Sequence, residues 1–167
     1  PVDRVRIQLK LRNGGSSDAL LYTVVVNRPG ETGRSYRLPT DNDRRVIDQA
    51  ANKLQRLGLA SSNTLSIVPD ETLPLMSGVF NAPLYGITKF EYLFSPRQQL
   101  TLYTISTLLK AVQISDVDVS IQTAIQTCLA IVLDRQANTL TALSRWHTTG
   151  EKIEGLFARQ AIPMVWD

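Results

Sequence analysis

SPRQQLTLYTISTLLKAV, from Ser95 to Val112, carries the strongest local signal in the chain and decides the fold of its second half. Ser95 can cap a helix, Pro96 suits the first helical position, and Gln98 can bond back to the cap from three residues on. Apolar side chains then recur at spacings of three and four, which predicts one buried helical face. That face contains Leu102, Ile105, Leu109 and Val112, widened by Leu108.

A second helix is predicted from about Val117 to Arg135, and Asp116 and Asp118 can cap it by accepting free amide hydrogens. The side chains expected on its buried face are Val117, Ile121, Ala124, Ile125, Cys128, Leu129 and Val132. Because Cys128 lies within this face, we interpret it as a small core residue and not as a nucleophile. A third helical piece is expected from near Gly150 towards Gln160.

The N-terminal part has the pattern of β-structure. VRIQLKLR, Val5 to Arg12, alternates apolar and polar residues, which predicts a strand with one buried face. LLYTVVV, Leu20 to Val26, is a second β-rich run, and the turn residues before it, which include Gly14 and Gly15, indicate a hairpin loop. SYRLP, Ser35 to Pro39, predicts a third short strand.

A helix from Asp41 to Leu57 is expected to cover this antiparallel sheet of about three strands. Thr40 and Asp43 have capping-box spacing, and Gly58 is a stop signal. Its apolar face contains Val46, Ile47, Ala50, Ala51, Leu54 and Leu57. The opposite face holds Arg44, Arg45, Lys53 and Arg56, which either meet phosphates or form an ordinary solvated surface.

The predicted fold class is therefore α+β, in which a small N-terminal antiparallel sheet with a covering helix precedes a helical bundle. Residues 1–58 form the basic sheet and helix part, and residues 95–167 form the helical part, truncated at its C-terminus. Between them, residues 59–94 are rich in Pro and Gly but too apolar for a flexible linker, so we expect this connecting region to wrap across both halves.

Composition and charge set broad limits. Of the 167 residues, 43% are apolar and 20% are charged, as in ordinary globular proteins. The sequence has no apolar run long enough for a membrane span and no signal-peptide pattern, so we expect no membrane partner and a cytoplasmic location. Pro1 to Arg56 hold eleven Lys or Arg against six Asp or Glu. This asymmetry favours a nucleic-acid partner, although Arg-rich surface strands are common.

The residue types needed for catalysis or metal binding do not gather in this sequence. One histidine, His147, supports no catalytic triad and is expected at the surface, and with the single Cys128 it supports no zinc site. Gly14 and Gly15 lack the spacing of phosphate-binding loops. The acidic residues near Asp70 and before the second helix have sufficient structural roles in turns and caps. We expect no catalytic residue, no cofactor site and no metal site in this chain.

Arginine beside an aromatic ring recurs along the chain, at Tyr36–Arg37, Phe94–Arg97, Arg145–Trp146 and Phe157–Arg159. Such pairs stack on bases and bind phosphates, and they also serve as cation–π packing within a fold. Both interpretations stay open at the level of sequence.

Five segments, in order, carry a family resemblance: YRLPT (Tyr36 to Thr40), VPDETLP (Val68 to Pro74), YGITKFEYLFSPRQQLTLYTI (Tyr85 to Ile105), LAIVLDRQANTLTALSRW (Leu129 to Trp146) and FARQAIPMVWD (Phe157 to Asp167). Together they resemble large proteins described as adenine-specific DNA methylases. The resemblance covers most of the chain from about Tyr36 onward, and LFSPRQ and FARQAIPMVWD are its most distinctive motifs.

The resemblance implies a parent protein that uses S-adenosylmethionine. In that family the glycine-rich cofactor motif precedes the present region and the catalytic DPPY-type motif follows it. NAPL, Asn81 to Leu84, is similar to NPPY, but it lacks the first proline and the aromatic residue, so we interpret it as a turn. The start at Pro1 and the apolar ending agree with a fragment lying between the two motifs.

Three roles follow from this resemblance and from the charge pattern. The chain can contact DNA as an accessory or target-recognition segment, it can bridge the remainder of the same polypeptide or dock a partner, or it can be an unrelated binding module. The candidate DNA-binding residues are Arg6, Lys10, Arg37, Arg44, Arg45, Lys89, Arg97, Arg145, Trp146, Arg159 and Gln160.

Overall fold

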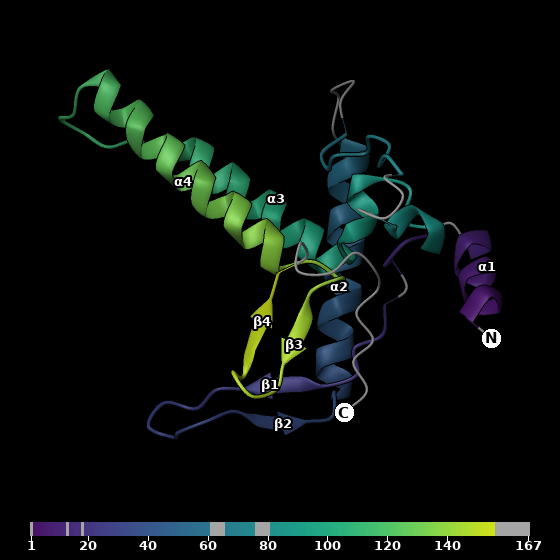
Figure 1. Cartoon of the computed structure of the whole chain (residues 1–167). Coiled ribbons are helices and arrows are strands. Elements are labelled where there is room, and N and C mark those ends of the chain that lie inside the picture. The colour runs from purple at the N-terminus through teal and green to yellow at the C-terminus, as the bar shows by residue number, and fades with distance from the viewer. Residues whose placement is uncertain (1, 13, 18, 61–65, 76–80, 156–167) are drawn as a thin grey trace.

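The computed structural model describes residues 2–12, 14–17, 19–60, 66–75 and 81–155. These residues form four α-helices, two short 3-10 helices and two separate two-stranded antiparallel sheets, which confirms the α+β class. In chain order the elements are α1 (Val2–Arg12), β1 (Val24–Val26), β2 (Ser35–Arg37), α2 (Asp41–Ala60), η1 (Ala82–Tyr85), η2 (Phe90–Leu93), α3 (Pro96–Ala111), α4 (Val119–Thr139), β3 (Arg145–His147) and β4 (Lys152–Glu154). Figure 1 shows α3 and α4 side by side as a hairpin that projects from the rest of the molecule.

The strand predicted from Val5 to Arg12 is wrong, because these residues belong to helix α1. An isolated strand leaves its backbone donors and acceptors unpaired, whereas a helix satisfies most of them internally. The long side chains of Arg, Gln, Leu and Lys in this segment are also good helix formers. The alternating pattern therefore did not decide the structure, since among the described residues no strand lies beside this segment to pair with it.

The two sheets differ from the single three-stranded sheet that the sequence predicted. β1 pairs with β2, with Val24 opposite Arg37 and Val26 opposite Ser35. Helix α2 lies beside β1, and the two elements line a small cavity together. β3 pairs with β4, with Arg145 opposite Glu154 and His147 opposite Lys152.

The helix predicted from Gly150 onward is wrong for residues 150–154, where the chain forms a turn and strand β4. The β3–β4 pairing supplies the hydrogen bonds that a helix would otherwise have made within itself. The rest of that predicted helix, towards Gln160, lies outside the described residues.

The predicted helix starts are confirmed. Ser95 donates its backbone N–H to Gln98 Oε1 at 2.8 Å, as a capping box requires. Thr40 donates its backbone N–H to Asp43 Oδ2 at 2.7 Å, and Asp43 N–H returns a bond to Thr40 Oγ1 at 3.3 Å. Asp118 accepts the N–H of Ser120 at 2.7 Å at the start of α4. In each case, the two residues that form the hydrogen bond lie within four consecutive positions of the sequence.

Two predictions about the helices need correction. Gly58 does not end α2, which continues to Ala60, because one glycine costs a helix only about 1 kcal/mol. Cys128 is exposed and does not lie in the core. The more buried face of α4 contains Ile125 and Leu129. The apolar residues predicted to share one buried face are therefore partly packed and partly exposed to solvent.

Most of the core comes from the connecting region, residues 59–94, which the sequence predicted to be irregular. The buried apolar side chains in the described residues are Leu73, Ala82, Ile87, Leu93 and Leu143, with Tyr92 and Phe94 packed against them. Backbone bonds hold this segment together: Leu73 N–H donates to Thr88 O at 2.9 Å, and Ala142 N–H donates to Leu93 O at 2.9 Å. The connecting region thus supplies most of this core, and Leu143 of the second half completes it.

The glycines after α1 have a packing role and do not form the predicted hairpin loop. Gly15 has a φ of 54°, and a Cβ there would lie closer than 3.0 Å to Tyr92. The adjacent Ser16 donates from Oγ to Tyr92 O at 2.6 Å. This loop is therefore pressed against η2 beside the core.

Candidate nucleic-acid interface

The structure brings three predicted site residues, Arg97, Arg145 and Trp146, to one cavity of about 470 Å³. The cavity lies where the N-terminal turn of α3, the C-terminal end of α4 and the β3–β4 hairpin meet. Its full lining is Arg97, Gln98, Thr101, Thr139, Leu140, Thr141, Ser144, Arg145, Trp146 and Ile153. Its volume lies in the range of small-ligand sites.

Arg97 is the exposed cation of this cavity. It is the second residue of α3, where the helix dipole already favours negative charge. In the part of the chain that the structure describes, no side-chain hydrogen bond or ion pair engages its guanidinium. Within the described residues, the five N–H donors of Arg97 are therefore available to a ligand.

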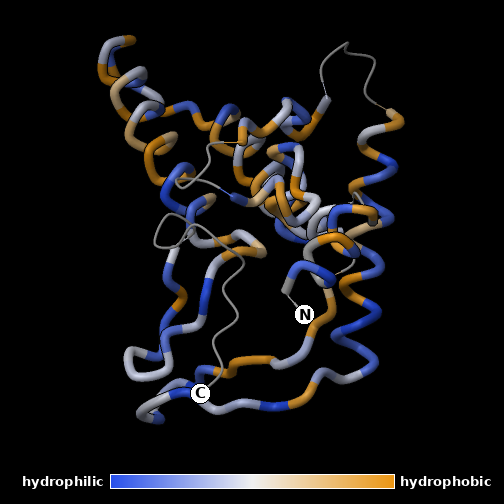
Figure 2. Tube along the Cα trace, turned by 45° about the vertical axis from the view of Figure 1, so that its right-hand side comes forward, coloured by the Kyte–Doolittle hydropathy of each residue, from blue (hydrophilic) through white to orange (hydrophobic). Residues whose placement is uncertain are grey.

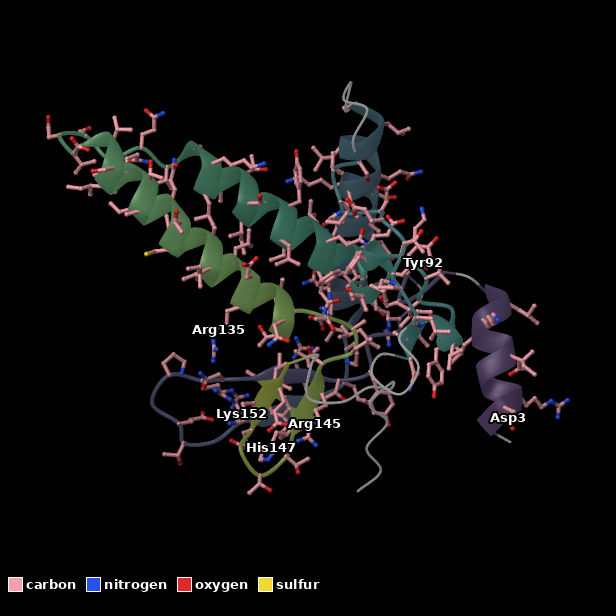
Figure 3. All side chains as sticks on the ribbon, turned by 45° about the horizontal axis from the view of Figure 1, so that its top comes forward. Asp3, Tyr92, Arg135, Arg145, His147 and Lys152 are labelled. Carbon is pink, nitrogen blue, oxygen red and sulfur yellow. The ribbon has the colours of Figure 1, made fainter. Side chains whose placement is uncertain are left out.

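Arg145 is held differently, because it faces Glu154 across the β3–β4 pair. Arg145 Nε donates to Glu154 Oε2 at 2.6 Å, and a second guanidinium nitrogen contacts the same oxygen. The bond from Arg145 is the main reason that the pKa of Glu154 lies below its ordinary value. Figure 3 shows Arg145, His147 and Lys152 gathered on this hairpin. The carboxylate neutralises Arg145 and fixes its position.

Trp146 is fixed by Tyr36, which lies 110 residues away in the sequence. Trp146 Nε1 donates to the Tyr36 hydroxyl at 3.1 Å, and the two rings meet edge to face with centroids 6.1 Å apart. Such a pair is worth about 0.5–1.5 kcal/mol beyond the area it buries. The contact orients the indole ring at the cavity and joins strand β2 to strand β3.

Two hydroxyl groups of the cavity, those of Thr101 and Ser144, are oriented as acceptors. Thr101 Oγ1 donates to Arg97 O at 2.8 Å, and Ser144 Oγ donates to Thr139 O at 2.8 Å. Because a hydroxyl has only one proton, these oxygens offer lone pairs to a ligand. The cavity combines a cationic donor with neutral acceptors, which suits a ligand that has both an anionic group and N–H donors.

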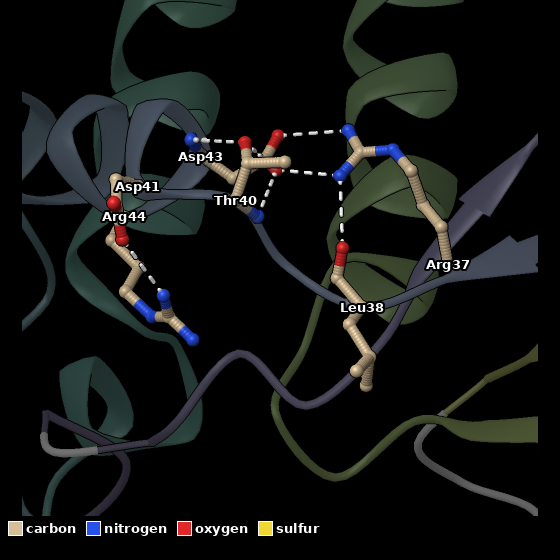
Figure 4. Close-up of polar contacts among 6 residues, drawn as sticks. All are labelled: Arg37, Leu38, Thr40, Asp41, Asp43 and Arg44. Carbon is tan, nitrogen blue, oxygen red and sulfur yellow. Dashed lines mark hydrogen bonds and ion pairs between the residues drawn. The ribbon is translucent and has the colours of Figure 1, made fainter.

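Arg97 also lines a second cavity of about 380 Å³, between β1 and α2. Asp43 lies on its wall and is bound by Arg37, whose two terminal nitrogens donate to the carboxylate at 2.6 and 3.0 Å (Figure 4). Bonds from Arg37 and then from Thr40 hold the pKa of Asp43 far below its ordinary value. Arg37 is thus engaged in fixing the start of α2.

Three further predicted site residues, Arg44, Arg45 and Lys89, line neither of these two cavities. Arg44 pairs with Asp41 at 3.1 Å, and Arg45 donates to Asn42 Oδ1 at 2.6 Å, both on the first turn of α2. Lys89 pairs with Glu91 at 3.4 Å, which is the main reason that its pKa is raised, and it lies 5.9 Å from the centroid of the Tyr92 ring.

The remaining candidates lie elsewhere. Lys10 is exposed on α1, which Figure 1 places at the edge of the molecule away from β3 and β4. Arg6 also lies on α1, and its side chain is not described. Arg159 and Gln160 lie outside the described residues.

Three further findings limit the kinds of site and helix in the described residues. Within the described ranges, His, Cys, Asp and Glu nowhere gather in a group of three that could hold a metal ion. His147, the last residue of β3, stabilises the β3–β4 turn, because its Nδ1 accepts the N–H of Gly150 at 2.8 Å. In the described part of the chain, none of the helices combines the length and the apolar composition that crossing a membrane requires.

Sequence reasoning missed part of the cavity. It assigned Gln98 only a capping role and gave no role to Thr101 or Ser144. Thr101 lies four residues after Arg97, so the helical period could have placed it beside that arginine. Tyr36 was noted beside Arg37, but nothing local to it indicates contact with Trp146.

Comparison with known proteins gives no relative for this fold or site. No protein-family model matches the chain, and it matches no curated protein and no solved structure.

Proposed function

We propose that this chain is an accessory or target-recognition segment of a DNA adenine methyltransferase, and that the cavity of Arg97, Arg145 and Trp146 contacts the nucleic acid. The proposal combines the family resemblance of the sequence with one structural observation. Arg97, which has no ion-pair partner within the described residues, and the oriented indole of Trp146 share one cavity. Arginine donors bind phosphates and indole rings stack on bases, so this pair suits a nucleotide.

In this proposal the chain does not itself transfer the methyl group. S-adenosylmethionine and the catalytic motif belong to the remainder of the same polypeptide, and the enzyme acts in the cytoplasm. In this proposal the Gly14–Gly15 loop has a packing role and does not bind phosphate, because a Cβ at Gly15 would lie closer than 3.0 Å to Tyr92. The flanking coding sequence tests this part directly, because it should contain a glycine-rich motif before the chain and a PPY-type motif after it.

Salt-dependent binding tests the DNA contact. Neutralising phosphates predicts that the logarithm of the binding constant falls linearly with the logarithm of salt concentration, with a steep negative slope. We expect fluorescence anisotropy with a labelled duplex to show this slope for the wild-type chain. Arg97→Gln should flatten the slope by about one unit, since it removes one phosphate contact.

Lys110→Gln is the matched control, because Lys110 is an exposed cation in the last turn of the same helix. It should leave the slope close to the wild-type value. Failure of the wild-type chain to bind at low salt would remove the DNA contact, and an equal loss in both variants would assign binding to net charge and not to this cavity.

A second candidate, a protein-interaction module without DNA contact, is favoured by the apolar side chains that α4 exposes. Ile121, Ile131 and Val132 are 50%, 62% and 62% exposed. If the chain does not bind DNA, protein interaction is the better-supported function.

A further inference from the structure

Helix α4 carries an exposed stripe that nothing in the described structure covers. We define this α4 stripe by four exposed residues: Ile121, Ala124, Cys128 and Ile131. The more buried residues Ile125 and Leu129 lie on the neighbouring side of the helix. Figure 2 shows hydrophobic segments along this projecting α3–α4 hairpin.

The spacing of the α4 stripe has a specific meaning. The steps from Ile121 to Ala124, to Cys128 and to Ile131 are three, four and three residues, which is the a/d repeat of a helix–helix seam. A helix that packs only once needs a single apolar face. Because α4 already has its face towards α3, the stripe provides a second one.

Charge restricts what can cover this stripe. Between Asp118 and Asp134, α4 contains no Asp, Glu, Lys or Arg, and α3 contains none from Gln98 to Leu109. Burying a charged partner side chain against such a surface would cost several kcal/mol, so the partner must be equally uncharged over a similar length. The α4 stripe of a second copy meets this condition.

We propose that α4 pairs with α4 of a second copy, antiparallel about a twofold axis. Pairing each a position with a d position places Ile121 opposite the partner's Ile131, and Ala124 opposite the partner's Cys128. Large side chains then face large ones and small face small, on both sides of the axis. This self-matching is what an isologous interface requires.

The charged ends of the stripe agree with the antiparallel direction. Arg135, which follows the stripe, lies in line with it and is exposed, and in the described residues no ion pair engages it. The antiparallel register brings Arg135 to the start of the partner's α4, where the partner's Asp118 lies. A parallel pairing would instead bring Asp118 next to Asp118 and Arg135 next to Arg135, which is unfavourable.

The seam is short. From Ile121 to Arg135 it spans about 21 Å at 1.5 Å per residue. An interface of this length falls in the small, transient class below about 1,200 Å². The dimer should therefore exchange with monomer, and its fraction should rise with protein concentration.

Sedimentation velocity of the whole chain, from about 1 to about 500 μM, tests the pairing. The wild-type chain should move from monomer to dimer and stop there. Ile131→Glu, which places a carboxylate in the seam, should raise the dissociation constant at least about tenfold. Ala130→Glu is the matched control, because Ala130 is exposed on the opposite face of the same helix turn, and it should dimerise like the wild type.

Circular dichroism checks that both variants keep the wild-type helix content. As an independent measurement, a short bis-maleimide linker should join two chains through Cys128, which flanks the twofold axis, and Cys128→Ser should abolish the product. The pairing is wrong if the wild-type chain stays monomeric at every concentration, if Ala130→Glu weakens association as much as Ile131→Glu, or if association continues beyond the dimer.

Discussion

The segment from Glu71 to Leu93 and the α3–α4 hairpin are opposites within one chain. The first has little regular structure, yet its described residues supply four of the five buried apolar side chains, Leu73, Ala82, Ile87 and Leu93. The second is almost entirely helical, yet neither helix contains a fully buried residue. Regular secondary structure and burial are therefore separate properties here, because a helix satisfies its own backbone wherever it lies, and burial requires neighbours.

The largest expected effect comes from removing one leucine side chain from each region. Leu93→Ala, at a side chain that is 4% exposed, should lower the free energy of unfolding by about 2–5 kcal/mol through lost burial and a residual cavity. Leu108→Ala, at a side chain that is 62% exposed on α3, should lower it by less than about 1 kcal/mol. Urea denaturation measures the free energy of unfolding of both variants. Similar losses of stability in the two would show that the two regions do not differ in burial.

A second pair of substitutions separates backbone strain from close packing. Gly86 and Gly30 have nearly equal φ values, 83° and 84°. A Cβ at Gly86 would lie closer than 3.0 Å to the Leu9 carbonyl of α1, whereas one at Gly30 would meet nothing within 4 Å. Gly30→Ala should cost about 1–2 kcal/mol for the left-handed conformation alone.

Gly86→Ala should cost about 1–3 kcal/mol more than Gly30→Ala, because α1 must also move away from η1. The comparison uses urea midpoints of the two variants. Equal midpoints would mean that α1 does not pack closely against Gly86.

The smallest effect is expected at the start of α2, which is exposed like the hairpin. The pKa of Asp43 is lowered in the folded state by Arg37 and Thr40, so its contribution to stability is fully present above the unfolded pKa of about 3.9. That contribution is lost as the pH falls from about 4 towards the folded pKa. Asp43→Asn should therefore be less stable than wild type at pH 6, and the difference should shrink below pH 4.

Urea midpoints of wild type and Asp43→Asn, measured between pH 3 and pH 6, test this expectation. Asp48→Asn is a suitable control, since Asp48 is an exposed acid two turns into the same helix. A constant difference between wild type and Asp43→Asn across this range would show that the Arg37–Asp43 contact does not couple to folding.

The candidate interface was only partly predictable. Arg97, Arg145 and Trp146 were identified because each arginine lies within three residues of an aromatic ring, which is a local feature. Their convergence on one cavity was not predictable, since it depends on the β3–β4 hairpin packing beside the first turn of α3. The same local feature also predicted Arg37 as a site residue, but in the structure Arg37 forms an ion pair with Asp43.

The sequence by itself determined the α+β class and the starts of α2, α3 and α4. Those starts depend on side-chain-to-backbone bonds between Thr40 and Asp43, Ser95 and Gln98, and Asp118 and Ser120. The partners are no more than three residues apart, so neighbours in sequence are sufficient. Tertiary structure alone decided that Val5–Arg12 is helical, that Cys128 is exposed, and that Tyr36 meets Trp146. Apolar and alternating patterns indicate which residues can be buried or can pair in a sheet. Only the positions of segments distant in the sequence decide which of those residues are buried or paired.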